Sequence, residues 1–269
     1  MKWWKKLLSA DLQVGSNLIH GTSAALSVVV PAILDDGNAH FQSLRNQGAQ
    51  YHISHSLEDD KALYRPLGGV PLIARTLLAL DQIPGIQEVI VVIREAELKR
   101  MADICKAFDI QRVRKVVCAK EPGLEALTVG VYECERSADY IAIHDPLRPF
   151  ITADVFLEAL AAAVKTGAGA PAVPVKDTIK IVSAGVIQDT PERSSLHLLQ
   201  TPQVVDSSLL KAALEQAREV GAMAVELPTA LEILGLPLKL TQGLDENIRV
   251  RSAADIPAAE TILARRAYI

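Results

Sequence analysis

Residues 88–93 form the stretch Glu88-Val-Ile-Val-Val-Ile93, which after its first residue is a continuous apolar run of Val and Ile side chains. Such a run is typical of a strand that is covered on both faces, as in a parallel sheet. Helical patterns lie on either side of it, at residues 72–80 and 95–108. Four further strand-like runs share its character: Ser27 to Ile33, Val113 to Cys118, Tyr140 to His144 and Ala170 to Val175.

Helical patterns continue to separate these runs along the chain, with further examples at residues 124–135 and 155–165. Strands that alternate with helices predict a mostly parallel sheet with helices on both of its faces. We therefore expect an α/β fold built on a Rossmann-like, doubly wound, mostly parallel sheet. A single domain is expected over residues 26–269, after an N-terminal segment at 1–25.

Two regions interrupt this alternation. Residues 34–64 form a long polar insertion, and connections of that length are usually functional lids or mobile segments. Residues 176–203 contain a hairpin-like pair of strands around the turn Ser183-Ala-Gly185. A hairpin that leaves an α/β domain has no core of its own, so we expect a protruding β-arm that docks on a second subunit.

Composition excludes several classes of partner. The 269 residues contain 28 Lys and Arg against 32 Asp and Glu, a net charge of −4, so a nucleic acid is not expected as the main partner. No apolar run is long enough to span a bilayer. The three cysteines are too far apart for a zinc pair or a disulfide framework, which predicts reduced thiols and a cytoplasmic location. A local basic site for a small phosphate compound remains open.

Charged residues follow the predicted strand at 140–144, and parallel sheets bind their ligands at the carboxyl ends of strands. Asp145 could hold a divalent cation there, and Arg148 could anchor a phosphate or fix the aspartate. A purely structural Asp–Arg turn is an equal alternative. In the predicted arm, Thr178 and Arg193 offer a hydroxyl and a guanidinium, groups that suit phosphate because arginine pairs bidentately with its oxygens.

Four segments occur in an order and spacing that are specific in combination. They are Ile143-His-Asp-Pro-Leu-Arg-Pro-Phe150, Ala172-Val-Pro-Val-Lys-Asp-Thr-Ile-Lys180, Asp189-Thr-Pro-Glu-Arg-Ser-Ser-Leu-His-Leu-Leu-Gln-Thr-Pro-Gln203 and Asn247-Ile-Arg-Val-Arg-Ser-Ala-Ala-Asp-Ile256. Over roughly Ser27 to Leu263 the chain resembles the 2-C-methyl-D-erythritol 4-phosphate cytidylyltransferase family. The resemblance implies a nucleotide-diphospho-sugar transferase type of fold. It also implies transfer of the cytidylyl group of CTP to a sugar-alcohol phosphate in isoprenoid precursor biosynthesis, with release of pyrophosphate.

The resemblance also implies roles for individual residues and partners. The implied catalytic residues are Lys61, Asp145 and Arg249. The implied substrate-binding residues are Thr178, Arg193 and Arg148. The implied nucleotide-binding residues are Pro31, Ala32 and Ile33. Asp145 would hold Mg²⁺, Arg65 is an alternative to Lys61 as the source of positive charge, and the 176–203 arm would join two chains in a homodimer.

The chain departs from the family pattern after its first strand. Where the family has a glycine-rich loop, this sequence has Pro31-Ala-Ile-Leu-Asp-Asp36, and Arg249 replaces the family's lysine. Two alternatives therefore stay open beside the enzyme. One is a catalytically impaired homologue that acts as a binding or regulatory protein. The other is a cytidylyltransferase that acts on another polyol phosphate, such as ribitol 5-phosphate.

Overall fold

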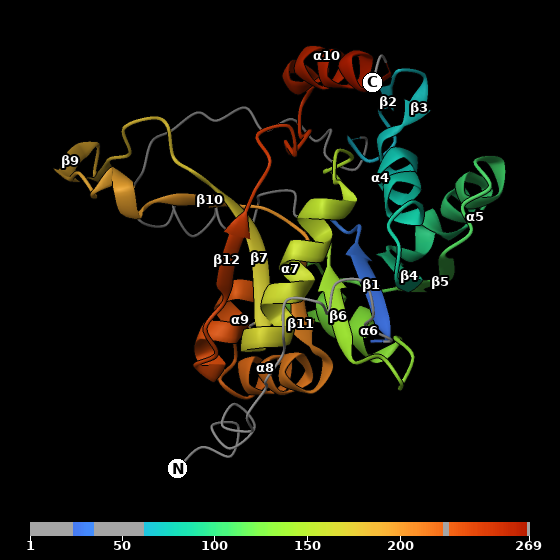
Figure 1. Ribbon diagram of the computed structural model, residues 1–269, viewed down its shortest axis with the longest axis horizontal. Coiled ribbons are helices and arrows are strands. Elements are labelled where there is room, and N and C mark those ends of the chain that lie inside the picture. The colour runs from blue at the N-terminus through green and yellow to red at the C-terminus, as the bar shows by residue number, and fades with distance from the viewer. Residues whose placement is uncertain (1–23, 35–61, 223–225, 268–269) are drawn as a thin grey trace.

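The computed structural model describes residues 24–34, 62–222 and 226–267, and its main sheet joins eight strands (Figure 1). These strands are β1 (Leu26–Pro31), β4 (Ile86–Ile93), β5 (Val113–Cys118), β6 (Tyr140–Ile143), β7 (Ala168–Pro174), β10 (His197–Leu199), β11 (Gln203–Asp206) and β12 (Lys239–Gln242). Strands β6, β1, β4 and β5 are parallel neighbours, and β12 is parallel to β7. Strands β10 and β11 run antiparallel to their partners, so the sheet is mixed but mostly parallel.

Seven α-helices surround this sheet in the described part of the chain. They are α4 (Leu72–Asp81), α5 (Leu98–Ala107), α6 (Leu124–Tyr132), α7 (Ala153–Thr166), α8 (Ser207–Glu219), α9 (Leu227–Leu234) and α10 (Ile256–Ala267). Single 3₁₀ turns are η2 (Glu95–Glu97), η3 (Arg193–Ser195) and η4 (Ala253–Asp255), and β2 (Pro66–Leu67) pairs with β3 (Val70–Pro71). None of these helices is long and apolar enough to cross a membrane.

Alternate side chains of β1 divide the core into two layers. Val28 and Val30 belong to a cluster that includes side chains of α4, α5, α7 and α10. Val29 belongs to a second cluster, which contains side chains of α6, α8 and α9. Because successive residues of a strand point to opposite faces, the sheet is covered by helices on both sides. This arrangement confirms the predicted α/β, doubly wound fold.

The arm extends away from the sheet (Figure 1). It carries an antiparallel hairpin of β8 (Ile181–Ser183) and β9 (Val186–Asp189). Ala184 and Gly185 join the two strands with positive φ values of 48° and 77°, the backbone that two-residue hairpin turns require. Chain from the arm rejoins the main sheet as β10, next to β7. The predicted protruding arm is thus present, and its hairpin turns at the expected residues.

Each strand predicted from an apolar run is present within a few residues of its expected bounds. The alternation of apolar runs and helical patterns in the sequence did not predict the antiparallel strand β11 or the helices α8 and α9. The N-terminal segment 1–25 and the insertion 34–64 lie almost entirely outside the described residues. Both remain predictions, as does the division of the chain at residue 26.

Candidate active site

Asp145 lies just beyond the carboxyl end of β6 and forms the centre of a charged group. Its carboxylate is 14% exposed, and its Oδ2 lies 2.8 Å from Arg249 Nε. The same oxygen lies 3.9 Å from Arg148 Nε. The other oxygen, Oδ1, accepts a hydrogen bond of 2.9 Å from the backbone N–H of Leu147. Two guanidinium groups share one carboxylate, so the group is net positive and suits a phosphate-bearing ligand.

Arg148 is bound mainly to the protein. Its Nη1 donates to the carbonyl oxygen of Asn247 at 2.5 Å, and its Nη2 donates to that of Leu199 at 3.4 Å. Burial lowers the pKa of the guanidinium, and the charge of Asp145 partly opposes that shift. These contacts connect the turn after β6 to the segments before β11 and after β12. Arg148 therefore braces the Asp145 turn.

Arg249 is more open than Arg148. Its side chain is 33% exposed while it pairs with Asp145. The next residue, Val250, is fully buried, and its backbone N–H donates to the carbonyl oxygen of Leu147 at 2.9 Å. This backbone bond fixes Arg249 beside the Asp145 turn. Arg249 is thus the member of the pair whose guanidinium can also reach a ligand.

A buried amide pair joins the two loops behind this group. Gln200 is 5% exposed; its side chain donates to the carbonyl oxygen of Leu244 at 2.9 Å and accepts from the Leu244 N–H at 3.1 Å. Asn247 is fully buried, and its Nδ2 donates to the carbonyl oxygen of Thr201 at 3.0 Å. The Thr201–Pro202 peptide bond that follows is cis. The segments that carry Arg249 and Thr201 are therefore held together.

His144 is fully buried immediately before Asp145. Its Nε2 lies 3.1 Å from the carbonyl oxygen of Arg148, and its Nδ1 lies 3.2 Å from the hydroxyl of Thr201. Burial lowers the pKa of His144 to about 4, so the imidazole is neutral at pH 7. A core histidine with both ring nitrogens satisfied needs no proton-transfer role, and the burial and the two contacts agree with that interpretation.

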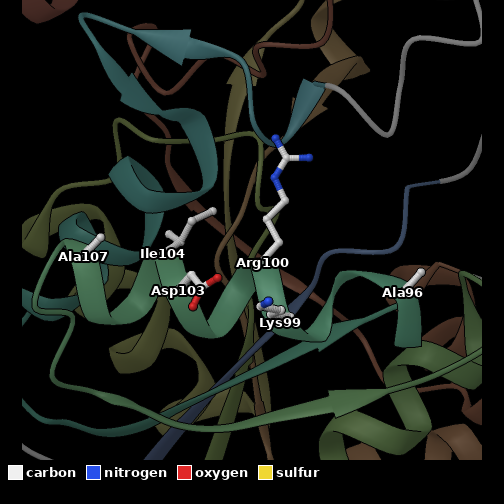
Figure 2. Close-up of a pocket in the computed structure, with 6 residues that line it drawn as sticks. All are labelled: Ala96, Lys99, Arg100, Asp103, Ile104 and Ala107. Carbon is white, nitrogen blue, oxygen red and sulfur yellow. The ribbon is translucent and has the colours of Figure 1, made fainter.

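A shallow hollow lies elsewhere, over helix α5. Figure 2 shows that its lining side chains come from α5 and the turn before it: Ala96, Lys99, Arg100, Asp103, Ile104 and Ala107. The guanidinium of Arg100 stacks over the ring of Tyr64 with its carbon 3.5 Å from the ring centroid. Asp145, Arg148 and Arg249 are not among the lining residues, so the hollow is separate from the Asp145 group.

A model of the family described as "2-C-methyl-D-erythritol 4-phosphate cytidylyltransferase", IspD, matches residues 55–265. The chain belongs to this family. A relative of that name from Geobacillus thermodenitrificans (strain NG80-2) is 37% identical over 203 residues, which cover 74% of this chain and 87% of the relative. Another of that name, from Halalkalibacterium halodurans, is 30% identical over 240 residues, which cover 89% of this chain and 97% of the relative.

Solved structures show the same fold. The crystal structure of 4-diphosphocytidyl-2C-methyl-D-erythritol synthase from Anaerococcus prevotii superposes with a TM-score of 0.72 at 22% identity. The match covers 90% of this chain and 96% of that one. The enzyme named 2-C-methyl-D-erythritol 4-phosphate cytidylyltransferase from Thermus thermophilus gives a TM-score of 0.65 at 22% identity, over 88% and 98% of the two chains. The mixed sheet with its helices is therefore the fold of the IspD family.

Of the two expected alternatives for the family's lysine, Arg65 lies within the described residues. Lys61 lies outside the described residues. The Nη1 of Arg65 donates to the carbonyl oxygen of Arg251 at 3.4 Å. Arg251 is two residues beyond Arg249, so Arg65 contacts the same loop that supplies a guanidinium to Asp145.

The expected nucleotide-binding residues continue β1 instead of opening a glycine-rich loop. The backbone N–H of Ala32 donates to the carbonyl oxygen of Val92 at 2.7 Å, which extends the pairing with β4. The side chains of Ala32 and Ile33 are each 5% exposed, and Ile33 packs in the α6–α8 cluster. Any contact of Ala32 or Ile33 with a nucleotide would therefore be made mainly by the backbone, whereas Pro31 is partly exposed.

The two expected acceptor-binding residues lie on the exposed arm. Arg193, in η3, donates from Nη1 to the carbonyl oxygen of Lys176 at 3.2 Å, which closes the base of the arm. Thr178 precedes β8 and is exposed. No hydrogen bond or ion pair joins either residue to Asp145 in the described part of this chain. Of the expected site residues that the structure describes, Asp145, Arg148 and Arg249 are assembled into one group.

Sequence reasoning did not identify Thr201 and Asn247 as parts of this group, although both lie in quoted motifs. The signal was present in the segment Gln200-Thr-Pro-Gln203, because a rigid, amide-rich turn often ties two loops together. This signal could not reveal the partners of Thr201, since Asn247 lies 46 positions and His144 57 positions from it in the sequence.

Proposed function

We propose that this protein is a 2-C-methyl-D-erythritol 4-phosphate cytidylyltransferase, which uses CTP and releases pyrophosphate. The observation that carries the proposal is the Asp145 group at the carboxyl end of β6, with Arg249 at 2.8 Å, in a chain of the IspD family. Ligands of open α/β sheets bind at this edge. The net positive group provides the charge that a triphosphate and a second phosphate require.

The proposed reaction is an in-line displacement at phosphorus. An oxygen of the acceptor's phosphate attacks the α-phosphorus of CTP, a new P–O bond forms, and the bond from the α-phosphorus to the bridging oxygen of pyrophosphate breaks. The leaving pyrophosphate takes the electron pair, and a phosphate oxygen anion needs no general base to attack. Catalysis is then mainly positioning and neutralisation of charge.

Within this reaction, the chain's own residues have distinct roles. Arg249 pairs with phosphate oxygens through its partly exposed guanidinium, and Arg148 keeps the Asp145 turn in place through the carbonyl oxygens that it binds. Arg65, from the segment before β2, reaches the same loop and adds positive charge beside it. Lys61 stays a proposal from the family motif.

Asp145 is the proposed ligand of a divalent cation. Within the described residues no group of three or more His, Cys, Asp and Glu side chains could hold a metal ion. Mg²⁺ at nucleotide sites is commonly held by one or two carboxylates together with the substrate's phosphates, so a single carboxylate at the edge of the sheet fits that mode. Mg²⁺ would supply neutralisation of the triphosphate charge.

The arm supports a homodimer. Both strands of the hairpin expose apolar side chains: Ile181, Val182, Val186 and Ile187 are each 49–61% exposed. A two-stranded hairpin is barely stable alone, and exposed apolar side chains in a cluster mark contact surfaces. In this proposal the arm docks on a second copy of the chain, where Thr178 and Arg193 bind the acceptor's phosphate.

The test is release of pyrophosphate from CTP and 2-C-methyl-D-erythritol 4-phosphate in the presence of Mg²⁺. We expect Asp145→Asn to lower kcat/KM by roughly 10²–10³-fold, the usual cost of a lost charge-positioning group. Asp103→Asn, an exposed carboxylate on α5, is the matched control and should leave the rate unchanged.

Other results of this experiment separate the alternatives. Turnover of ribitol 5-phosphate but not of methylerythritol phosphate would show that the enzyme acts on a different acceptor from the one proposed. Absence of turnover, together with no rise of Tm on addition of CTP, would leave a non-catalytic homologue as the remaining hypothesis, which no comparison with known proteins supports.

A separate experiment tests the arm. Ile187→Asp should convert a dimer to a monomer in sedimentation equilibrium, and an unchanged mass would refute docking through the hairpin.

A further inference from the structure

The side chains of His144 and Thr201 form a partly buried contact beside the proposed catalytic group, and no step of the proposed reaction uses either side chain. His144 is fully buried. Each of its ring nitrogens has one partner: the carbonyl oxygen of Arg148 at 3.1 Å for Nε2, and the hydroxyl of Thr201 at 3.2 Å for Nδ1. The same hydroxyl oxygen accepts the backbone N–H of Asp145 at 3.0 Å.

The chemistry of the partners determines the direction of every hydrogen bond. A carbonyl oxygen only accepts, so Nε2 of His144 carries the proton and donates to Arg148. In a neutral imidazole Nδ1 is then an acceptor, and the hydroxyl of Thr201 donates to it. The chain of bonds therefore runs from the Asp145 N–H to the Thr201 oxygen, from the Thr201 hydroxyl to Nδ1 of His144, and from Nε2 to the Arg148 carbonyl.

This chain of bonds holds both ends of one turn. It begins at the amide of Asp145 and ends at the carbonyl of Arg148, and between them the N–H of Leu147 donates to the Asp145 carboxylate. Thr201 is itself fixed, because its carbonyl oxygen accepts from Asn247 at 3.0 Å. The direction of the carboxylate thus depends on the side chains of His144, which is buried, and Thr201, which is partly buried, and neither of them touches it.

We propose that His144 and Thr201 are positioning residues, whose hydrogen-bond chain fixes the 145–148 turn and orients the Asp145 carboxylate. The inference rests on the proposed function, since the orientation matters for that reaction. Neither residue contacts the reacting atoms. Their effect passes through Asp145, which distinguishes this role from a general contribution to folding.

The kinetic test uses two variants at one position. Thr201→Val keeps the shape of the side chain but removes the hydroxyl, whereas Thr201→Ser keeps the hydroxyl. We expect Thr201→Val to lower kcat about tenfold or more with the KM for CTP changed less than about twofold, and Thr201→Ser to stay within about threefold of the wild type. All rates are measured well below each variant's Tm. A Thr201→Val enzyme with a kcat within twofold of the wild type would overturn the proposal.

A double-mutant cycle tests whether the effect passes through Asp145. In an Asp145→Asn background, Thr201→Val should lower the rate less than twofold, because the carboxylate that it orients is already gone. A general structural role predicts the full tenfold loss in both backgrounds, and that result would overturn the proposal.

Nitrogen NMR of the imidazole gives a readout that needs no turnover. At pH 7 the ¹⁵N shifts of His144 should be those of the Nε2–H tautomer in the wild type. The Nδ1–H tautomer or a charged ring would overturn the hydrogen-bond chain even if the enzyme is active. A wild type that makes no pyrophosphate, but shows the Nε2–H tautomer, would instead overturn the proposed function and the positioning role that rests on it.

Discussion

Burial of His144 makes the stability of the protein depend on pH. The pKa of this side chain is 6.5 when exposed and about 4 in the folded protein, first because of burial, with smaller opposing effects from Arg148 and Asp145. Below pH 6.5 the unfolded chain therefore binds a proton that the folded chain does not. Stability contributed by the neutral histidine is complete above pH 6.5 and is lost as the pH falls toward 4. For this pKa shift, the linkage between protonation and folding lowers the free energy of unfolding by about 2 kcal/mol at pH 5 and by about 3 kcal/mol at pH 4.

The matched substitution is His144→Gln, which cannot be protonated but keeps one acceptor for Thr201 and one donor for Arg148. The free energy of unfolding is measured with urea at pH 7 and pH 5, at one protein concentration. The wild type should lose about 2 kcal/mol more than the variant over this interval. His197→Gln, which changes an exposed histidine on β10, should behave as the wild type. Parallel losses in the wild type and His144→Gln would refute the argument.

Three further predictions concern stability and thiol reactivity. A methyl group at Gly130 would overlap Cγ1 of Val29, so Gly130→Ala should lower the free energy of unfolding by about 1–3 kcal/mol in a urea titration; an unchanged midpoint would contradict this close helix–sheet contact. The Asp206 side chain accepts from two backbone N–H groups at the start of α8, so Asp206→Ala should cost about 1 kcal/mol, while Asp206→Asn should recover most of it. A thiol reagent at pH 7 should modify exposed Cys118 first and Cys134 only on unfolding, because Cys134 is buried and its pKa is raised to about 12; equal rates by mass spectrometry would argue against that burial.

Strands with both faces covered could be predicted from the sequence alone. The runs at β1, β4 and β6 are short and mostly apolar because helices cover both of their sides. No comparable signal marks β11, because only its two central residues, Val204 and Val205, are apolar. Helix α8 does carry a signal that the strand pattern overlooked: Asp206 caps it, and its apolar side chains recur at helical spacing.

The candidate site was predictable where it follows a strand and not where it depends on distant segments. Asp145 and Arg148 could be identified because parallel sheets bind their ligands at the carboxyl ends of strands, where both residues lie. The sequence motifs also pointed to Arg249, but not to its contact with the carboxylate. Arg148 was expected either to bind a phosphate or to fix Asp145, and the structure shows that its guanidinium contacts two carbonyl oxygens of the protein. Binding of substrate by Arg148 stays a prediction. The spacing could not reveal these contacts, because it carries no information on which backbone carbonyls lie nearby.

The arm and the Asp145 turn are parts of one continuous path of chain. The arm leaves the sheet at the end of β7 and returns as β10, and the next residues after β10 are Gln200 and Thr201, which hold the loops of the charged group. A displacement of the arm therefore reaches the hydroxyl that binds the Asp145 amide without crossing the core. In the proposed homodimer, a substitution that changes how the arm packs on the second chain would therefore also act on the backbone from which the site is built.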